Sequence, residues 1–209
     1  MEEAHEQEAH WLVAAKAGDS DAVARLFDQH RRRLRRLVEV RLDQRLAGRV
    51  DPSDVIQDVY VDVHNRIHEF EDGDLPFFLW LRLKVGHRLV DLHRFHLGAQ
   101  KRSASREISL HRGPLPVASS ASLASRLLGK MTSVSNVAIR AEMRLRVQEA
   151  LNRMDETDRE VLVLRHFEDL SNAETARVLS LSKTAASNRY VRALRRMKTA
   201  IEGSAKATE

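Results

Sequence analysis

The stretch from Leu170 to Lys198 places short polar side chains and basic ones at the spacing of two consecutive helices. Its residues, LSNAETARVLSLSKTAASNRYVRALRRMK, predict helices at about 172–179 and 183–198 with a turn of three residues between them. The second helix is rich in Lys and Arg and has no acidic residue. Hydroxyl, amide and guanidinium groups in this arrangement can bind base edges and phosphates in the major groove of DNA. The candidate side chains are Ser182, Lys183, Thr184, Ser187, Asn188, Arg189 and Arg192.

A basic amphipathic helix can also be an ordinary member of a helical bundle, and for a single helix this is the more frequent explanation. Here both helices begin with a predicted cap, Ser171 with Glu174 for the first and Ser182 for the second. Two capped helices joined by a tight turn favour the binding of DNA. The side chains expected to pack the second helix on its own domain are Leu181, Ala185, Tyr190, Val191 and Leu194.

An acidic helix is predicted at residues 51–70. Asp51 can cap this helix, and Pro52 suits its first position. Like charges four residues apart share one face of a helix and repel one another, and a basic partner outside the chain would relieve that repulsion. The three aspartates at this spacing are Asp54, Asp58 and Asp62.

The apolar spacing is helical along most of the chain, and aromatic residues make up only 5% of it, so we expect an all-α protein. A Ser-rich stretch at 103–136 contains two prolines and no sustained period, which predicts a flexible linker. The sequence therefore predicts two small helical domains, at 9–102 and 137–202. The further helices expected are 9–30 with a break at Gly18-Asp19, Phe27 to Gly48, 77–96, one from about 137, and one with a capping box at Thr157 and Glu160.

Several classes of function are disfavoured by what the sequence lacks. There is no cysteine, so disulfides and thiolate metal sites are excluded. His93 and His96 stand three residues apart on one helix but have no third ligand at a characteristic spacing, so we expect no metal. No Gly-rich phosphate loop and no nucleophile arrangement is present, so we expect no cofactor and no catalytic activity. The acidic N-terminus has no apolar signal core and no stretch is long enough to span a membrane, which predicts a cytoplasmic protein.

Both halves of the chain resemble bacterial sigma factors of the sigma-70 family, and most closely the extracytoplasmic-function (ECF) group. In the second half, Ser180 stands where the family usually has a turn glycine. The residues that match the family pattern there are Arg159-Glu160-Val161-Leu162, Leu164-Arg165, Leu170-Ser171, Glu174, Ala176, Leu179, Ser182, Arg189 and Arg192-Ala193-Leu194. Those that match in the first half are Asp51, Asp54, Gln57, Asp58, Phe77, Trp80, Leu81, Asp91 and Arg94.

The resemblance implies a subunit of RNA polymerase that directs promoter-specific initiation without chemistry of its own. The first domain would resemble sigma region 2, and the second would resemble region 4, whose helix-turn-helix reads the minus-35 element. The residues implied in docking on core polymerase are Asp51, Asp54, Gln57 and Asp58. Those implied at the minus-10 element are Phe77, Trp80, Arg82, His87, Arg88, Asp91, Arg94, Lys101 and Arg102, with Phe77 and Trp80 expected to be mainly structural.

The partners implied by the resemblance are promoter DNA and two parts of core polymerase, the coiled coil of the largest subunit and the flap. An anti-sigma factor is a further potential partner, and the free protein is expected to be a monomer. The alternative is a transcriptional regulator that uses only the helix-turn-helix, with the N-terminal half as a sensor. Binding to core polymerase distinguishes the two.

Overall fold

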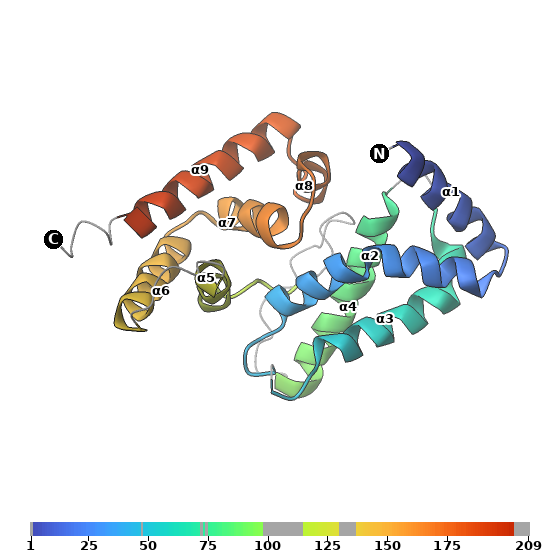
Figure 1. The fold of residues 1–209 in the computed structure, drawn as a ribbon, viewed down its shortest axis with the longest axis horizontal. Helices are drawn as coiled ribbons and strands as arrows, with labels where there is room; N and C mark the ends of the chain where they lie inside the picture. The colour runs from blue at the N-terminus through green and yellow to red at the C-terminus, as the bar shows by residue number, and fades with distance from the viewer. Residues whose placement is uncertain are drawn as a thin grey trace. The chain divides into compact units, whose positions relative to one another are not determined.

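The computed structural model describes residues 2–46, 48–71, 73, 75–97, 115–129 and 137–202, and every regular element in these ranges is helical (Figure 1). The prediction of an all-α protein is confirmed. The described residues divide into two compact units. The N-terminal unit contains residues 2–97 with 115–116, and the C-terminal unit contains 117–129 with 137–202.

The N-terminal unit is organised around its longest helix. Helix α2 (Ser20–Arg41) contacts α1 (Glu2–Lys16), α3 (Pro52–Arg66) and α4 (Phe77–Leu97), and a single 3-10 turn, Ile67–Glu69, follows α3. Helices α2, α3 and α4 share an apolar interior, because each presents a stripe of aliphatic or aromatic side chains to the others. Buried members of this interior include Leu26, Phe27, Leu34, Leu37, Val59, Val63, Leu81, Val85 and Leu89.

Local capping explains where α2 and α3 begin. The chain reverses at Gly18, whose φ of 96° is in the left-handed region that glycine adopts without strain. The Asp19 carboxylate then accepts hydrogen bonds from the backbone N–H groups of Asp21 and Ala22. Asp51 caps α3 through the N–H of Ser53, and Pro52 follows it, as predicted.

The predicted end of α2 at Gly48 is wrong. The helix ends at Arg41, because Leu42 adopts an extended backbone with ψ 127°. Leu42 and Leu46 are nevertheless buried, at 7% and 1% exposure. Their apolar period is satisfied by the turns that follow the helix rather than by the helix itself, and the Asp43 carboxylate caps those turns through the N–H of Arg45.

In the C-terminal unit, the described helices α5 (Ser120–Gly129) to α9 surround a small apolar core. Helix α9 (Lys183–Glu202) contacts α6 (Val137–Asn152), α7 (Glu156–Leu162) and α8 (Asn172–Val178) (Figure 1). Helix α7 continues into one turn of π-helix, Val163–Phe167. The predicted capping box at Thr157 is wrong, because α7 begins two residues earlier than that cap implies. Its cap is the carboxylate of Asp155, which accepts from the N–H groups of Thr157 and Asp158.

A helix occupies part of the predicted linker. Residues Ser120–Gly129 form α5, which packs against α6 in the C-terminal unit. Its apolar side is short: Leu123, Ala124 and Leu128 are buried, together with Ser120 and Ser122. The linker was predicted there because the segment is rich in serine. The segment is helical instead, because its leucines pack within the C-terminal unit and stabilise a helix. The domain boundaries at 102 and 137 stay predictions.

Leu123→Ala is expected to destabilise the C-terminal unit by about 2 to 5 kcal/mol, because it leaves a cavity at a fully buried position. Both tryptophans, Trp11 and Trp80, are in the N-terminal unit, so their fluorescence follows only that unit during urea unfolding. We expect the transition seen by circular dichroism to shift while the fluorescence transition stays in place. Leu145→Ala, at a side chain 62% exposed on α6, is the control. Equal effects of the two substitutions would mean that α5 is not part of this core.

Candidate nucleic-acid interface

Helices α8 and α9 each begin with a hydrogen-bonded serine cap. The Ser171 hydroxyl accepts from the N–H of Glu174, whose carboxylate accepts from the N–H of Ser171, so the predicted capping box is confirmed. The Ser182 hydroxyl caps α9 through the N–H of Ala185, at 3.1 Å. The amide of Asn172 donates to the backbone oxygen of Lys183, at 2.8 Å, and ties the start of α8 to the start of α9.

The turn between α8 and α9 has four residues, 179–182, instead of the predicted three. Ser180 has a φ of 53°, in the left-handed region. The family's usual glycine adopts this conformation without strain, while a serine adopts it at some cost. The hydrogen bond from the N–H of Leu181 to the oxygen of Ala176, at 2.8 Å, keeps the turn tight.

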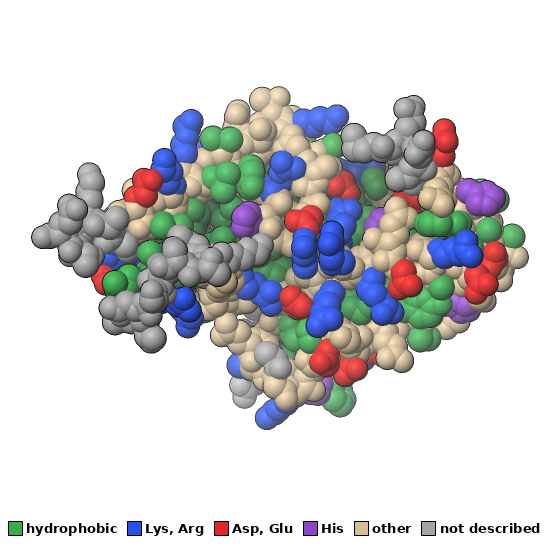
Figure 2. Space-filling model, in the orientation of Figure 1, with side chains coloured by type: hydrophobic (Ala, Val, Ile, Leu, Met, Phe, Trp, Pro, Cys, Tyr) green, Lys and Arg blue, Asp and Glu red, His purple; other side chains and the backbone are tan. Residues whose placement is uncertain are grey.

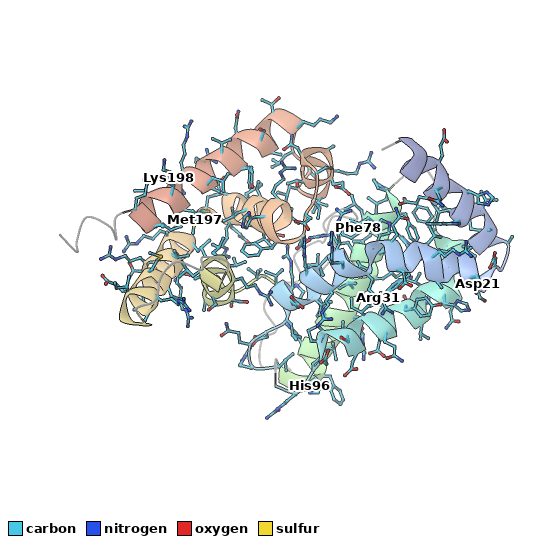
Figure 3. All side chains as sticks on the ribbon, viewed as in Figure 1. Asp21, Arg31, Phe78, His96, Met197 and Lys198 are labelled. Atoms are coloured by element: carbon cyan, nitrogen blue, oxygen red, sulfur yellow. The ribbon has the colours of Figure 1, made fainter. Side chains whose placement is uncertain are left out.

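One face of α9 is buried and the opposite face is exposed. Ala186, Ala193 and Met197 form the buried stripe, and Lys198 next to Met197 is exposed (Figure 3). The predicted packing of Val191 and Leu194 is wrong, since these side chains are 42% and 39% exposed. Small alanines let α9 approach α7 and α6 closely, so they form the contact in place of the larger side chains. The candidates that are exposed, as predicted, are Lys183, Thr184, Ser187, Asn188 and Arg192, and Ser182 is exposed as well.

Basic side chains follow α9 along its exposed side, as the blue atoms in Figure 2 show. Arg195 and Arg196 are exposed, and Lys198 forms an exposed ion pair with Glu202 at 3.5 Å. Exposed cationic side chains along one helix can bind the phosphates of a DNA duplex. The surface combines these cations with the short polar side chains at the start of the helix.

Arg189 and Arg192 have partners inside the unit. Arg192 donates from Nε and Nη2 to the Asp158 carboxylate at 2.5 and 2.6 Å, and Arg189 donates from Nη1 to Asp158 at 2.7 Å and to Asp155 at 3.1 Å. The Asp158 side chain is buried. The hydrogen bond from Arg192 holds the pKa of Asp158 below its usual range, and the same bond raises the pKa of Arg192. Sequence reasoning missed Asp158, because no local pattern indicates a partner more than thirty residues away.

The acidic face of α3 is partly neutralised within the N-terminal unit. Asp58 accepts from Nε and Nη2 of Arg88 at 3.0 and 2.5 Å, and Asp62 lies 3.3 Å from Lys84. The sequence predicted that a partner outside the chain relieves the repulsion between these aspartates. Part of the relief comes from within the chain, through Arg88 and Lys84 of α4. Asp54 is exposed and has no ion pair among the described residues, while Gln57 is exposed beside it. The Asp51 carboxylate is engaged as a cap, and the N–H of Ser53 lowers its pKa.

The aromatic candidates of α4 are mostly interior. Phe77 is 2% exposed, and its ring lies 5.8 Å from that of Trp80, so its role is packing. Phe78 is also buried and lies against α2, where the Arg33 guanidinium is 3.5 Å from its ring (Figure 3). Trp80 is half-buried, with Lys84 Nζ 5.0 Å from its ring.

The charged candidates of α4 divide by exposure. Arg82 is 2% exposed, so its side chain is part of the interior of the N-terminal unit, and its predicted role at the minus-10 element stays a prediction. Arg88 is paired with Asp58. The exposed candidates are His87, Asp91 and Arg94. Lys101 and Arg102 lie outside the described residues.

The environment of His93 does not favour a metal site. Its Nε2 accepts from the backbone N–H of Asp43 at 3.4 Å, and burial lowers its pKa. The side-chain hydrogen bond from Arg45 lowers the pKa of Asp43 to about 2. Within the described ranges, no group of three His, Cys, Asp or Glu side chains could hold a metal ion. No helix in those ranges is long and apolar enough to cross a membrane.

Comparison with known proteins covers both units. Residues 144–197 match the family model for sigma-70, region 4. The RNA polymerase sigma factor CnrH of Cupriavidus metallidurans is 32% identical over 144 residues, which are 68% of this chain and 69% of CnrH. NccH of Alcaligenes xylosoxydans xylosoxydans, also an RNA polymerase sigma factor, is 27% identical over 193 residues, 91% of this chain and 92% of NccH.

Two further similarities concern the ECF group and the fold. The ECF RNA polymerase sigma factor SigD of Mycobacterium tuberculosis is 26% identical over 190 residues, 91% of this chain and 82% of SigD. A solved structure of CnrH in complex with the cytosolic domain of CnrY has a TM-score of 0.54 at 23% identity, covering 94% of this chain and 98% of CnrH. The structural similarity is one of fold.

Proposed function

The chain belongs to the ECF sigma factors of the sigma-70 family, which are transcription initiation factors and not enzymes, and we propose that its two units divide promoter recognition between them. The C-terminal unit would bind the minus-35 element. The N-terminal unit would dock on core RNA polymerase and hold the minus-10 element. Its place of action would be the cytoplasm, where the polymerase works.

Recognition of the minus-35 element is supported by the exposed face of α9. Lys183, Thr184, Ser187 and Asn188 lie at the N-terminal end of the second helix of a helix-turn-helix, which is the end that enters the major groove. Their amide, hydroxyl and ammonium groups can bind base edges and phosphates. This face is the observation on which the proposal chiefly rests. Ser182 would act mainly by fixing the start of the helix, since its hydroxyl is already the cap.

Docking on core polymerase would use the first turns of α3. Asp54 and Gln57 are exposed, and Asp54 carries a charge that no described residue neutralises. An exposed carboxylate attracts a basic surface such as a coiled-coil arm of the largest polymerase subunit. Asp58 would take part by exchanging Arg88 for a residue of the polymerase, and Asp51 by holding the helix start.

The minus-10 element would meet the exposed side of α4. His87 and Arg94 are exposed there and would contact phosphates, and Arg88 would do so when Asp58 binds the polymerase. Asp91 would position these cations, and Trp80 would shape the surface from its half-buried site. Lys101 and Arg102, which follow α4 in the sequence, would be further contacts to phosphates.

A hollow in the C-terminal unit suits the polymerase flap. It lies between α5, α7 and α9 and has a nearly apolar lining that includes Leu127, Leu162, Leu194 and Met197. An apolar segment of the flap would fill this hollow and cover the exposed part of Leu194. CnrH is known in complex with the cytosolic domain of CnrY, and we extend this to propose that a regulatory protein, such as an anti-sigma factor, also binds this chain.

The full-length chain is expected to co-elute with core RNA polymerase and to direct initiation from a subset of templates in a random-sequence promoter library. The measurement is size-exclusion chromatography at low salt, followed by sequencing of the transcribed templates. Enrichment of two short motifs separated by a constant spacer would agree with a two-part grip on the promoter. Failure to bind core polymerase at low salt would contradict the proposal and favour a regulator that acts through the helix-turn-helix alone.

A further inference from the structure

Asp158 is the point at which α7 holds the DNA-facing helix. Its side chain is 1% exposed and accepts three hydrogen bonds from α9, two from Arg192 and one from Arg189. The two arginines are three residues apart, so they lie next to each other on the helix and reach the same carboxylate. Asp158 therefore fixes both the rotation of α9 and the direction of two cationic side chains.

The side chains of Arg189 and Arg192 are 30% and 51% exposed, but the carboxylate that they share is buried. A buried carboxylate that loses its cationic partners is left as an uncompensated charge, which is a large cost. The contact that an arginine would gain with a DNA phosphate is weaker, because it is exposed to solvent and screened by salt. Arg189 and Arg192 should therefore stay on Asp158 when DNA binds.

The exposed residues of α9 show what this arrangement leaves for DNA. Thr184, Asn188 and Arg195 recur at intervals of four and seven residues on the side opposite the buried Ala186 and Ala193. Arg189 and Arg192 lie at the edge of this face, beside α7. A rotation of α9 about its axis would change which side chains point outward. The hydrogen bonds from Arg189 and Arg192 to Asp158, which we call the clamp, oppose that rotation.

We propose that Asp158 is a positioning residue for promoter specificity: by holding Arg189 and Arg192 against α7, it keeps both guanidinium groups off the DNA phosphates and sets the face of α9 that reads bases. This inference rests on the proposed minus-35 function of the same helix. It assigns the two arginines to the clamp and leaves base reading to the exposed polar residues before them.

The salt dependence of DNA binding tests the clamp directly. Asp158→Asn keeps the shape of the side chain but removes its charge, so the arginines are released towards the phosphates. On a 30-base-pair duplex of scrambled sequence, the slope of log K against log salt should steepen by about 0.9 for each new phosphate contact, and by roughly 2 at most. The specificity is the affinity of the protein for templates selected by the wild-type holoenzyme, divided by its affinity for the scrambled duplex. This ratio should fall about tenfold, because the released arginines strengthen binding to any sequence.

Glu149→Gln is the matched control, because it removes one acidic charge from an exposed ion pair on α6. It should leave both the slope and the affinity ratio near the wild-type values. Equal changes in the two variants would mean that net charge alone is responsible, and that result would overturn the proposal. An unchanged slope in folded Asp158→Asn protein would overturn it as well.

Arg192→Ala gives an independent reading if Asp158→Asn does not fold. In the wild-type background the slope should stay unchanged, because the Arg192 guanidinium is held by Asp158. A slope that becomes shallower by about 0.9 would show that Arg192 binds a phosphate, and the clamp would be wrong. These slopes are measured without polymerase, so a chain that failed to bind core polymerase would contradict the proposed function while leaving the test of Asp158 intact.

Discussion

Asp54→Arg is expected to weaken the binding of the full-length chain to core RNA polymerase by about 100-fold, with the fold unchanged. Charge pairs at protein interfaces have coupling energies large enough for such an effect, and reversal adds repulsion to the lost attraction. Asp54 is exposed and has no ion pair among the described residues, so the substitution breaks no pair described within the chain. The measurement is the dissociation constant by fluorescence anisotropy, at two salt concentrations.

The control is Asp28→Arg on α2. Asp28 is also exposed, with a single exposed ion pair to Arg31, and its substitution changes the net charge by the same amount. We expect little change in affinity and a Trp fluorescence transition like that of the wild type for both variants. A similar loss of affinity in the two variants would indicate general electrostatic attraction and not docking through α3.

Asp58 is a less direct probe of the same surface, although it belongs to the same predicted set. Its carboxylate is already bound by Arg88, so Asp58→Arg both removes a potential docking group and leaves the Arg88 side chain without its partner. Both groups of this pair are well exposed, at 41% and 50%, so the stability cost should be small. The clearer result is therefore expected from Asp54.

The double substitution Arg189→Ala with Arg192→Ala is expected to lower the melting temperature of the C-terminal unit by roughly 10 °C, because it leaves the buried Asp158 carboxylate without a cation. Promoter binding would then be lost together with stability. The measurement is thermal unfolding of the full-length chain by circular dichroism, with Trp fluorescence as the internal reference for the N-terminal unit.

Arg195→Ala with Arg196→Ala is the matched control, since it removes the same charge from the same helix at exposed positions. It should leave the melting temperature nearly unchanged and reduce only the affinity for DNA. If the two double variants melted at the same temperature, the ion pairs with Asp158 would have no structural role.

Acid should reduce the difference between the wild type and the Arg189→Ala, Arg192→Ala variant. The pKa of Asp158 in the folded unit is below its ordinary 3.8, chiefly because Arg192 donates to it. The stability from this pair is therefore fully present above pH 3.8 and is lost as pH falls through the lower pKa of the folded state. Without the arginines, burial raises the pKa of the Asp158 carboxyl. Protonation in acid then removes its unpaired charge, which makes the variant less destabilised relative to the wild type.

Features that depend on near neighbours were predictable from the sequence. The caps at Asp51 and Ser171 need only a backbone N–H two or three residues away, so the local pattern is sufficient to identify them. The helical apolar spacing of α3 likewise predicts which of its sides is buried. Exposure of the polar residues at the start of α9 follows in the same way, while their contacts with DNA stay predictions.

The features that sequence reasoning missed are contacts between distant helices. Arg88 and Asp58 are thirty residues apart, and Asp158 is separated from its arginines by more than thirty. Helix α5 was missed because its serines resemble a linker and its leucines are stabilised by α6.

The sequence by itself determined the family and the order of the helices other than α5, because caps, apolar period and matching motifs are properties of short segments. Only the tertiary structure decided which charges are available to a partner. Arg82 is buried, Arg192 is held by Asp158 and Asp54 is exposed, although all three are simply charged residues on helices in the sequence. The difference arises because the packing of two helices sets their rotation, and this rotation determines whether a side chain meets solvent, the core or an opposite charge.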